Sequence, residues 1–168
     1  MQTILETERL RLREFSVDDT DFIIELLNSP GWIQFIGDRN VKTKEQATGY
    51  LLNGPLKSYA THGFGLWLVE KRTDLTPLGM CGIIKRDNLD TPDIGFAFLP
   101  QYSGQGYALE VASATLSYAK EKLGIQKIAA ITMAGNTRSI RLIEKIGLRH
   151  VKAFCFPNTE TELQLYSN

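Results

Sequence analysis

The sequence predicts an α/β (α+β) fold, in which a mixed, mostly antiparallel sheet of about seven strands is flanked by about four helices. Short apolar runs, several of them alternating, are typical of strands, and longer stretches with an apolar residue every three or four positions are typical of helices. Their order is strand, two helices, three strands, helix, strand, helix and two strands. This order predicts helices on both faces of one sheet. The 168 residues, 43% of them hydrophobic, suffice for one core, so we expect a single domain over 1–168.

The N-terminal part predicts one strand and two helices. Residues 9–13 alternate arginine and leucine, as a half-buried strand does. After Ser16 the apolar period changes to three or four, which predicts a helix ending near Pro30. A loop with Trp32, Phe35 and Ile36 follows. Thr43 is a suitable N-cap for a second helix, to about residue 59, that the glycines and proline of 49–55 break or shorten.

The remaining elements are short strands and two further helices. Residues 65–70, 78–84 and 93–98 read as a three-strand meander because turn residues separate the apolar runs. Residues 107–123 carry an apolar stripe and Gly124 can cap the end, so this helix is the best defined. A strand over 127–133 and a helix opened by Asn136 and capped by Gly147 come next. Strands over 148–156 and 160–166 complete the sheet.

Composition excludes several classes of function. Nineteen basic and nineteen acidic residues cancel without long blocks of one sign, so we expect neither a nucleic-acid nor a membrane surface. No secretory signal or membrane-spanning run is apparent, which predicts a cytoplasmic protein. Cys81 and Cys155 form neither a zinc pattern nor a disulfide framework, and we interpret both as reduced. We expect no metal site.

The segment Gln101 to Gly106 is the strongest indication of function. It stands between a predicted strand and a predicted helix, where two glycines can turn several main-chain N–H groups, and the helix dipole, toward one anion. The common nucleotide-binding loops do not match, since no Gly-Lys-Ser/Thr follows and Leu109 stands where a third glycine would. The spacing Gln101-x-x-Gly104-x-Gly106 resembles the coenzyme A pyrophosphate loop of the GCN5-related N-acetyltransferases, the GNAT superfamily.

The resemblance extends over nearly the whole chain, because the predicted order of elements is that of the GNAT fold. The opening residues 7–14, Thr-Glu-Arg-Leu-Arg-Leu-Arg-Glu, and the later Asn136-Thr-Arg-Ser139 are similar to the RimJ/RimL-type branch. This resemblance implies acetyl transfer from acetyl-CoA to a primary amine, either a protein N-terminal α-amine or a small-molecule amine, by direct attack in a ternary complex. A monomer or a homodimer is expected.

The resemblance also implies which residues hold the cofactor. A bulge in the family separates two strands and frees the main-chain groups that here belong to Phe96, Ala97 and Phe98 for the pantetheine arm. The N–H near Phe98 would polarise the thioester carbonyl. Asn136 resembles the residue that bonds the pantetheine amide, and it is also a plain N-cap candidate. Main-chain N–H groups would cradle the pyrophosphate, with Gln101 in the place of an arginine common in the family; those N–H groups belong to Ser103, Gly104, Gln105, Gly106 and Tyr107.

The sequence defines the general base and general acid of the reaction less well than it defines the cofactor site. Asp93 lies where family members often carry the carboxylate that deprotonates the amine, and it could equally cap the turn after Thr91. The usual tyrosine acid is replaced by Ile143, which leaves Ser139, or a water held by it, as the substitute. Arg138 and Arg141 could reach the 3′-phosphate of the cofactor or remain solvated. We expect Trp32, Phe35 and Tyr59 to lie in the core or to line an acceptor pocket, together with the last hairpin.

Two alternatives remain open from the sequence. The first is a non-catalytic acyl-CoA-binding or sensing domain, for which the absence of the tyrosine is the only indication. The second is a phosphate-binding enzyme that uses ATP or NAD. Binding of acetyl-CoA with no turnover of any amine would favour the first, and stabilisation by nucleotides alone would favour the second.

Overall fold

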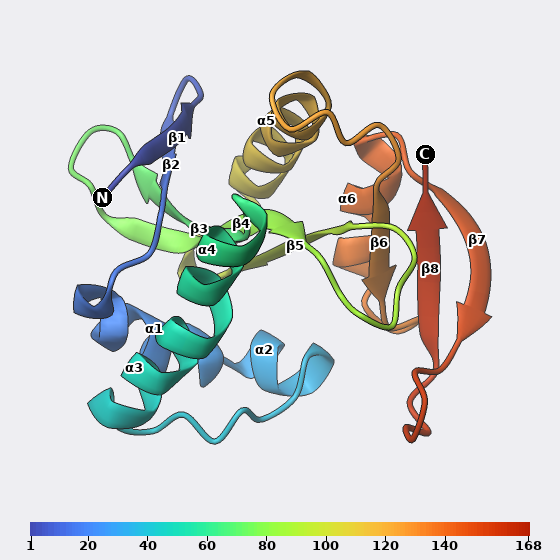
Figure 1. Cartoon of the computed structure of the whole chain (residues 1–168), viewed down its shortest axis with the longest axis horizontal. Helices are drawn as coiled ribbons and strands as arrows, with labels where there is room; N and C mark the ends of the chain where they lie inside the picture. The colour runs from blue at the N-terminus through green and yellow to red at the C-terminus, as the bar shows by residue number, and fades with distance from the viewer.

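A single eight-stranded sheet runs through the middle of the molecule, in the order β1-β2-β3-β4-β5-β6-β8-β7 (Figure 1). The computed structural model describes all 168 residues. Neighbouring strands are antiparallel except for β5 and β6, which are parallel. The strands are β1 (Thr3–Glu6), β2 (Leu10–Arg13), β3 (Leu66–Lys71), β4 (Pro77–Ile84), β5 (Asp93–Phe98), β6 (Ala129–Thr132), β7 (Arg149–Phe154) and β8 (Leu163–Ser167).

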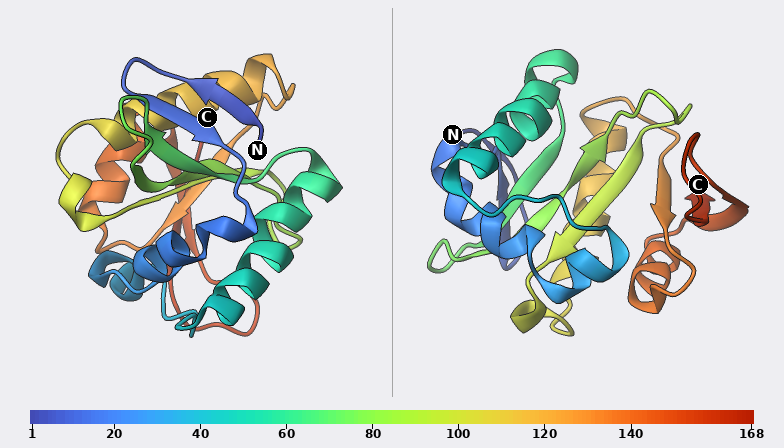
Figure 2. Two further views of the ribbon diagram at one scale, coloured as in Figure 1. Left: turned by 90° about the vertical axis from the view of Figure 1, so that its left-hand side faces the viewer. Right: turned by 90° about the horizontal axis from the view of Figure 1, so that it is seen from below.

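Helices cover both faces of the sheet, as the order of elements predicts (Figures 1 and 2). A cluster of 18 buried residues lies on the face of α5 and α6, and a second cluster of 12 lies on the face of α1, α2 and α3. The sheet is therefore packed on both sides. The helices are α1 (Thr20–Leu27), α2 (Pro30–Phe35), α3 (Lys44–Leu51), α4 (Lys57–His62), α5 (Tyr107–Glu121) and α6 (Thr137–Lys145).

The predicted helix boundaries largely coincide with local capping. Ser16 caps a 3-10 turn over Val17–Asp19 that leads into α1, and Thr43 caps α3; each forms a capping box with the residue three positions on. Gly124 and Gly147 adopt the left-handed φ values of 69° and 96° after α5 and α6. These helices begin and end where side chains or glycines satisfy the free backbone groups.

Three elements differ from the sequence prediction. Strand β1 was not predicted, and it adds an eighth strand at the edge of the sheet beside β2. The expected loop around Trp32 forms the short helix α2, because Pro30 occupies its first position, where its missing N–H costs nothing. The helix after Thr43 is interrupted as expected but is not short: a π-helical turn, Leu52–Leu56, accommodates Pro55 and the chain stays helical to His62.

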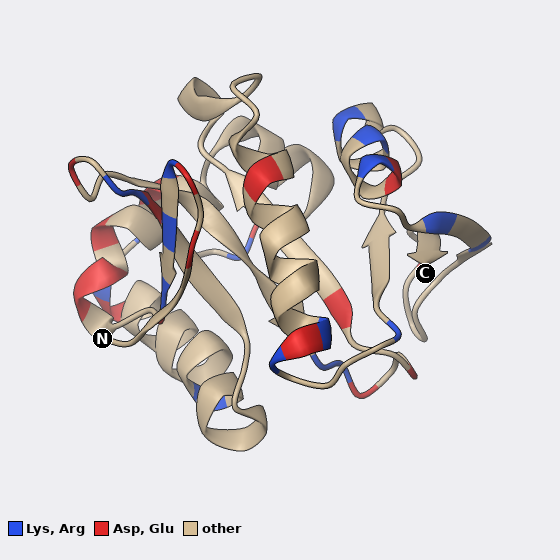
Figure 3. Cartoon of the chain, turned by 90° about the horizontal axis from the view of Figure 1, so that it is seen from above, with Lys and Arg blue, Asp and Glu red and all other residues tan.

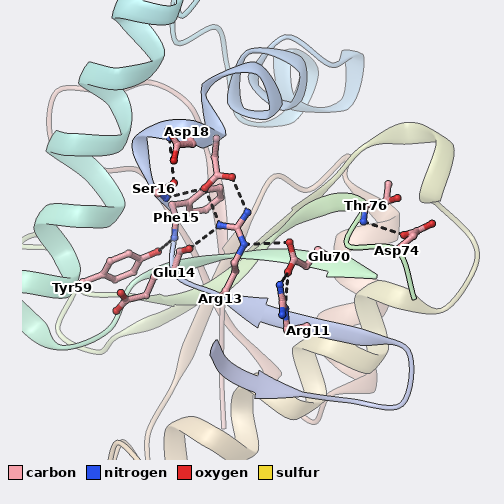
Figure 4. A network of polar contacts seen from close by, with 11 residues as sticks. Arg11, Arg13, Glu14, Phe15, Ser16, Asp18, Tyr59, Glu70, Asp74 and Thr76 are labelled. Atoms are coloured by element: carbon pink, nitrogen blue, oxygen red, sulfur yellow. Dashed lines mark hydrogen bonds and ion pairs between the residues drawn. The ribbon is translucent and has the colours of Figure 1, made fainter. Parts of the chain in front are cut away.

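A buried ionic network fastens the N-terminal helices to the sheet (Figure 4). The Glu70 carboxylate on β3, only 2% exposed, accepts hydrogen bonds from Arg11 Nε at 2.6 Å and Arg13 Nε at 3.2 Å. Arg13 also donates to both carboxylate oxygens of Asp19, at 2.9 and 2.8 Å. The Tyr59 hydroxyl of α4 accepts from the Phe15 N–H and donates to the Leu66 carbonyl. These contacts hold the helices beneath one face of the sheet in a fixed position.

Strands β4 and β5 lie close together at Gly79. A Cβ atom at this position would lie 2.3 Å from the Ala97 carbonyl oxygen and 2.9 Å from the Phe98 Cα. Both neighbours are backbone atoms of β5 and cannot rotate away. Gly79 therefore sets where the C-terminal end of β5 lies.

We predict that Gly79→Ala lowers the free energy of unfolding by about 1–3 kcal/mol, because the added methyl group must displace β5. Gly49→Ala is the matched control: Gly49 lies within α3, and a Cβ atom added there would have no neighbour within 4 Å, so alanine should raise stability by up to about 1 kcal/mol. Urea unfolding of both variants measures the two effects. Equal changes in the free energy of unfolding of the two variants would contradict the close approach of β4 and β5 at Gly79.

Candidate functional site

Strands β5 and β6 separate almost as soon as they meet. Asp93 and Ala129 form the single register pair between them, and the Ala129 N–H donates to the Pro92 carbonyl at 2.9 Å. Figure 2 shows the gap that widens between the two strands toward the end of β5. Beyond Asp93, the edge of β5 that faces β6 therefore has no strand partner.

The main-chain groups along this open edge can be assigned residue by residue. Leu99 N–H donates to Leu78 of β4 and the Ala97 carbonyl also faces β4, whereas the Pro92 carbonyl faces β6. Successive residues of a strand direct these groups to alternate sides. The N–H and C=O groups of Phe96 and Phe98 therefore point into the opening. Those of Ala97 do not, which corrects the expectation that all three residues offer main-chain groups.

The expected bulge is absent from the ladder between β4 and β5. Their register runs without a shift from Ile84–Asp93 to Gly79–Phe98. No residue is inserted in β5, so the opening arises because β6 diverges after one pair. The twist between neighbouring strands accounts for a separation of this kind when no further ladder bonds oppose it.

The glycine loop forms a turn that leads into α5. Gly104 and Gly106 adopt φ values of 74° and 80°, which glycine reaches without strain, and Gly106 is the N-cap of α5. Main-chain N–H groups of Gly104, Gln105, Gly106 and Tyr107 donate no hydrogen bond within the protein. Ser103 was expected to join them, but its N–H donates to the Pro100 carbonyl at 3.1 Å, although the residue does line the site.

Two glutamines fasten the loop from outside the site. Gln105 Nε2 donates to the Gln101 carbonyl at 3.1 Å, and Gln101 Nε2 contacts Glu25 of α1 at 3.4 Å. Neither glutamine lines the cavity. The side chain of Gln101 thus lies away from the position that an arginine would need to contact a bound phosphate.

Helix α6 forms the opposite wall. Asn136 accepts a hydrogen bond from the Ser139 N–H at 3.3 Å, so the predicted N-cap is confirmed, and both residues line the cavity. Arg138, Arg141 and Lys145 follow at helical spacing and also line it. Figure 3 shows the resulting concentration of basic residues on this helix. Lys145 was missed from the sequence, although its spacing of four from Arg141 was the available signal.

Together these elements enclose a cavity of about 850 Å³. Helix α2 and its C-cap residue line the remaining side with Trp32, Gln34, Phe35 and Ile36. Of these, the sequence left Trp32 and Phe35 between core and pocket. No aspartate or glutamate lines the cavity, and its charged residues are the three cations of α6. Free N–H groups at a helix N-terminus, a basic wall and an open strand edge fit a polyanionic ligand with an extended amide-containing arm, as coenzyme A is.

Trp32 is notable within this wall. Its side chain is 7% exposed, and the indole Nε1–H has no hydrogen-bond partner. A buried donor without a partner costs about 1–3 kcal/mol, and such groups are uncommon in folded proteins. Tyr59, by contrast, does not reach the cavity, because its hydroxyl group is bonded within the sheet contact described above.

Asp93 lies at the closed end of the opening and does not line the cavity. Its carboxylate is 1% exposed and accepts two hydrogen bonds from Arg86, from Nε at 2.8 Å and Nη2 at 3.2 Å. Burial raises the pKa of the Asp93 carboxyl group, and the Arg86 guanidinium opposes this rise. The partner is thus an arginine, which the sequence did not suggest, and not the turn after Thr91.

Other candidate groups lie away from the cavity. Ile143, at the usual tyrosine position, is 1% exposed and belongs to the core beneath α6. The two histidines of the chain also lie outside the cavity: His62 stacks on Phe64, and His150 contacts Gln164 at 2.7 Å on an exposed strand. No residue of β7, β8 or the hairpin turn between them lines the cavity, contrary to the expectation for the last hairpin.

No helix in the structure combines the length and the apolar character needed to cross a lipid bilayer.

Comparison with known proteins agrees with this geometry. Residues 9–149 match the family described as "Acetyltransferase (GNAT) domain". The chain is 33% identical to the uncharacterized protein YkkB of Bacillus subtilis over 154 residues, covering 90% of this chain and 88% of YkkB. It is 26% identical to an acetyltransferase (GNAT family) structure from Bacillus anthracis, with a TM-score of 0.80 and coverage of 99% and 98%.

A more distant structure shares the fold alone. RimL, the ribosomal L7/L12 α-N-protein acetyltransferase solved in complex with coenzyme A, superposes with a TM-score of 0.83 at 12% identity, covering 99% of this chain and 97% of RimL. The matched family spans most of the chain, including the loop, β5 and α6. The chain belongs to the GNAT family of acetyltransferases and is an acetyl-CoA-dependent acyltransferase.

Proposed function

We propose that residues 1–168 form one N-acetyltransferase domain of the RimJ/RimL type, which transfers acetyl to the neutral form of a primary amine. One observation carries the proposal: an open β5 edge and free loop N–H groups meet in a cavity that contains no carboxylate. The first two features suit the donor, and the third restricts the acceptor.

The donor side would be held mainly by main-chain groups. The N–H groups of Gly104 to Tyr107 and the dipole of α5 would bind the pyrophosphate, and the outward-facing groups of Phe96 and Phe98 would pair with the pantetheine amides. Asn136 lines the same cavity and its amide nitrogen is free to donate while Oδ1 caps α6. The cations of α6 would neutralise the remaining phosphate charge.

The chemistry requires one proton to leave the amine and one to reach the departing sulfur. The bound cofactor supplies an acetyl thioester; the amine nitrogen bonds to its carbonyl carbon, the C–S bond breaks, and protonation of the sulfur gives free coenzyme A. The Phe98 N–H would orient the thioester carbonyl. Ser139 lies in the cavity and can hold a water for the thiolate, whose thiol has a pKa near 8.5 and needs little acid assistance.

A cavity without a carboxylate favours an amine that is already partly neutral. An α-amino group has a pKa near 8, so roughly one in ten is neutral at pH 7, compared with fewer than about one lysine in a thousand. A polyamine carries several positive charges, and the cavity offers no acidic side chain to pair with them. We therefore propose α-amines, of peptides or amino acid derivatives, as the acceptors.

Trp32 supports a further feature of the acceptor. Its unpaired Nε1–H lies in the wall formed by α2, and an oxygen next to the reacting amine would satisfy it after a small shift. The carbonyl group beside an α-amine is an oxygen of this kind. The apolar side chains of Phe35 and Ile36 would contact the rest of the acceptor.

Asp93 is proposed to anchor the closed end of the opening and not to act as the base, because it is buried and paired with Arg86. The non-catalytic alternative retains one supporting observation, since neither a carboxylate nor the usual tyrosine enters the cavity. Turnover distinguishes the alternatives. The monomeric or homodimeric state and the cytoplasmic location stay predictions.

Release of free thiol from acetyl-CoA across a panel of acceptors tests the function. We expect turnover with N-terminal peptides or amino acid amides and none with spermidine. The assay needs the Cys155→Ser variant as background control, because Cys155 is exposed, whereas burial raises the pKa of the Cys81 thiol to about 12 and keeps it unreactive. Tight binding of acetyl-CoA with no turnover of any amine would favour the binding domain.

Gly104→Ala should weaken acetyl-CoA binding at least about tenfold, because alanine at φ 74° costs about 1–2 kcal/mol and shifts the loop that presents its N–H groups. Gly124→Ala is the control, since Gly124 has a φ of 69°, also has open space around it, and lies after the far end of α5. Calorimetric titration measures both affinities. If Gly104→Ala and Gly124→Ala lost the same stability and bound acetyl-CoA with the same affinity, the loop would not be part of the cofactor site.

Trp32→Phe should remove the donor and keep an aromatic wall. We expect the preference for a peptide amine over an alkylamine of similar size, measured as a ratio of kcat/KM values, to fall about 3- to 10-fold, the effect of one hydrogen bond. The KM for acetyl-CoA should not change. An unaltered preference would exclude Trp32 from acceptor recognition.

Asp93→Asn should lower stability by about 1–3 kcal/mol because the bidentate pair with Arg86 is lost, and Arg86→Gln should do the same. The shape of the pH profile of kcat/KM should match that of the wild type in both variants. If Asp93 is instead the base, Asp93→Asn alone would lose turnover at neutral pH and regain it as the pH rises.

A further inference from the structure

The turn between β1 and β2 is tied to the first turn of α5, although about one hundred residues separate them in sequence. Thr7 Oγ1 donates to Glu110 Oε1 at 2.6 Å, and the Arg9 main-chain N–H donates to the same oxygen at 2.9 Å. Arg9 Nε donates to Glu110 Oε2 at 2.7 Å. Figure 2 shows this hairpin lying against α5. Two residues of the N-terminal Thr7-Glu8-Arg9 motif are thus hydrogen-bonded to α5, the helix that follows the glycine loop.

Arg9 also contacts the loop itself. Its Nη1 donates to the Gln105 carbonyl at 3.0 Å, and its guanidinium carbon lies 4.5 Å from the centre of the Tyr107 ring. A Cβ atom on Gly106 would lie 3.3 Å from Arg9 Nη2. One side chain therefore contacts Gln105 and Tyr107 and passes close to Gly106 between them, at the N-terminus of α5. Arg9 does not line the cavity, so these contacts are made on the outer side of the loop.

The contact with Gln105 fixes the orientation of one peptide group. In a trans peptide the carbonyl group and the following N–H group point in opposite directions. Because the Gln105 carbonyl points at Arg9, the Gly106 N–H points away from Arg9, toward the side on which Gly106 lines the cavity. Gly106 has a positive φ and, as a glycine, a wide range of backbone conformations, so this peptide would be freer to rotate if its carbonyl were not held.

Electrostatics adds a second requirement. Glu110 places a carboxylate in the first turn of α5, close to where an anion would bind, and an unpaired charge there would repel it. Burial raises the pKa of Glu110, but the hydrogen bonds from Thr7 and Arg9 outweigh burial and leave that pKa below its usual value. The carboxylate is thus ionised at neutral pH, and Arg9 is the cation that pairs with it.

We propose that Arg9, held by Thr7 and Glu110, is a positioning residue for cofactor binding: it orients the Gln105–Gly106 peptide toward the pyrophosphate and neutralises Glu110. This inference rests on the proposed function, since it concerns the same loop. It assigns a physical role to the N-terminal Thr-Glu-Arg motif, whose resemblance to relatives did not explain what its residues do.

The test compares acetyl-CoA affinity and steady-state kinetics in three variants. Arg9→Gln removes the charge and the contacts, and Arg9→Lys keeps the charge but cannot bond Glu110 and Gln105 together in a fixed plane. Arg72→Gln is the matched control, because Arg72 anchors the same turn through the Thr7 carbonyl at 2.8 Å and touches no loop residue.

We expect Arg9→Gln to raise the Kd and the KM of acetyl-CoA about tenfold or more, with kcat at saturation changed less than about threefold, and Arg9→Lys to recover little of this loss. Arg72→Gln should bind like the wild type. If Arg9→Lys bound acetyl-CoA as tightly as the wild type, charge alone would explain the effect of Arg9 and the positioning role would be wrong. Unchanged affinity in Arg9→Gln would also overturn the inference. Failure of the wild type to bind acetyl-CoA would instead overturn the proposed function.

Discussion

The separation of β5 from β6 after one residue pair is the constraint on which the site depends. A continued parallel ladder would use the main-chain groups of Phe96 and Phe98 within the sheet and would close the cavity. Two features fix the opening. Gly79 allows β4 to hold the end of β5 on one side, and the buried Arg86–Asp93 pair lies where β5 and β6 still meet. A 3-10 turn over Pro100–Tyr102 then connects the free end of β5 to the two glycines of the loop.

The charged residues that line the cavity are all basic and all lie on α6. Cations of α6, the N-terminus of α5 and the loop N–H groups form a positive side for a polyanion. No carboxylate lines the cavity, and Glu110, in the first turn of α5, is paired with Arg9. In the function proposed above, this arrangement would hold the donor and supply no strong base. Deprotonation would then depend on the pKa of the acceptor amine.

The sequence predicted most of the elements in their order, helices on both faces of the sheet and the glycine turn before α5, because local periodicity and capping encode them, whereas β1 and α2 were not predicted. Residues such as Ser16, Thr43 and Asn136 act within a few positions of themselves. The features that the sequence missed depend on hydrogen-bond partners that local periodicity does not identify. Ser103 loses its N–H to Pro100, Ala97 turns toward β4, Asp93 meets Arg86, and Arg9 crosses to Glu110. A resemblance gives the residues of a site, whereas hydrogen-bond direction depends on packing that periodicity does not encode.

Amide hydrogen exchange followed by NMR, with and without acetyl-CoA, tests the role of the open β5 edge most directly, because it reports individual main-chain N–H groups. We expect slower exchange on binding at Phe96, Phe98 and Gly104 to Tyr107, with little change at Ala97 and Ser103, whose N–H groups are directed to β4 or Pro100. Binding of acetyl-CoA with no added protection at Phe96, Phe98 or the loop would contradict this role.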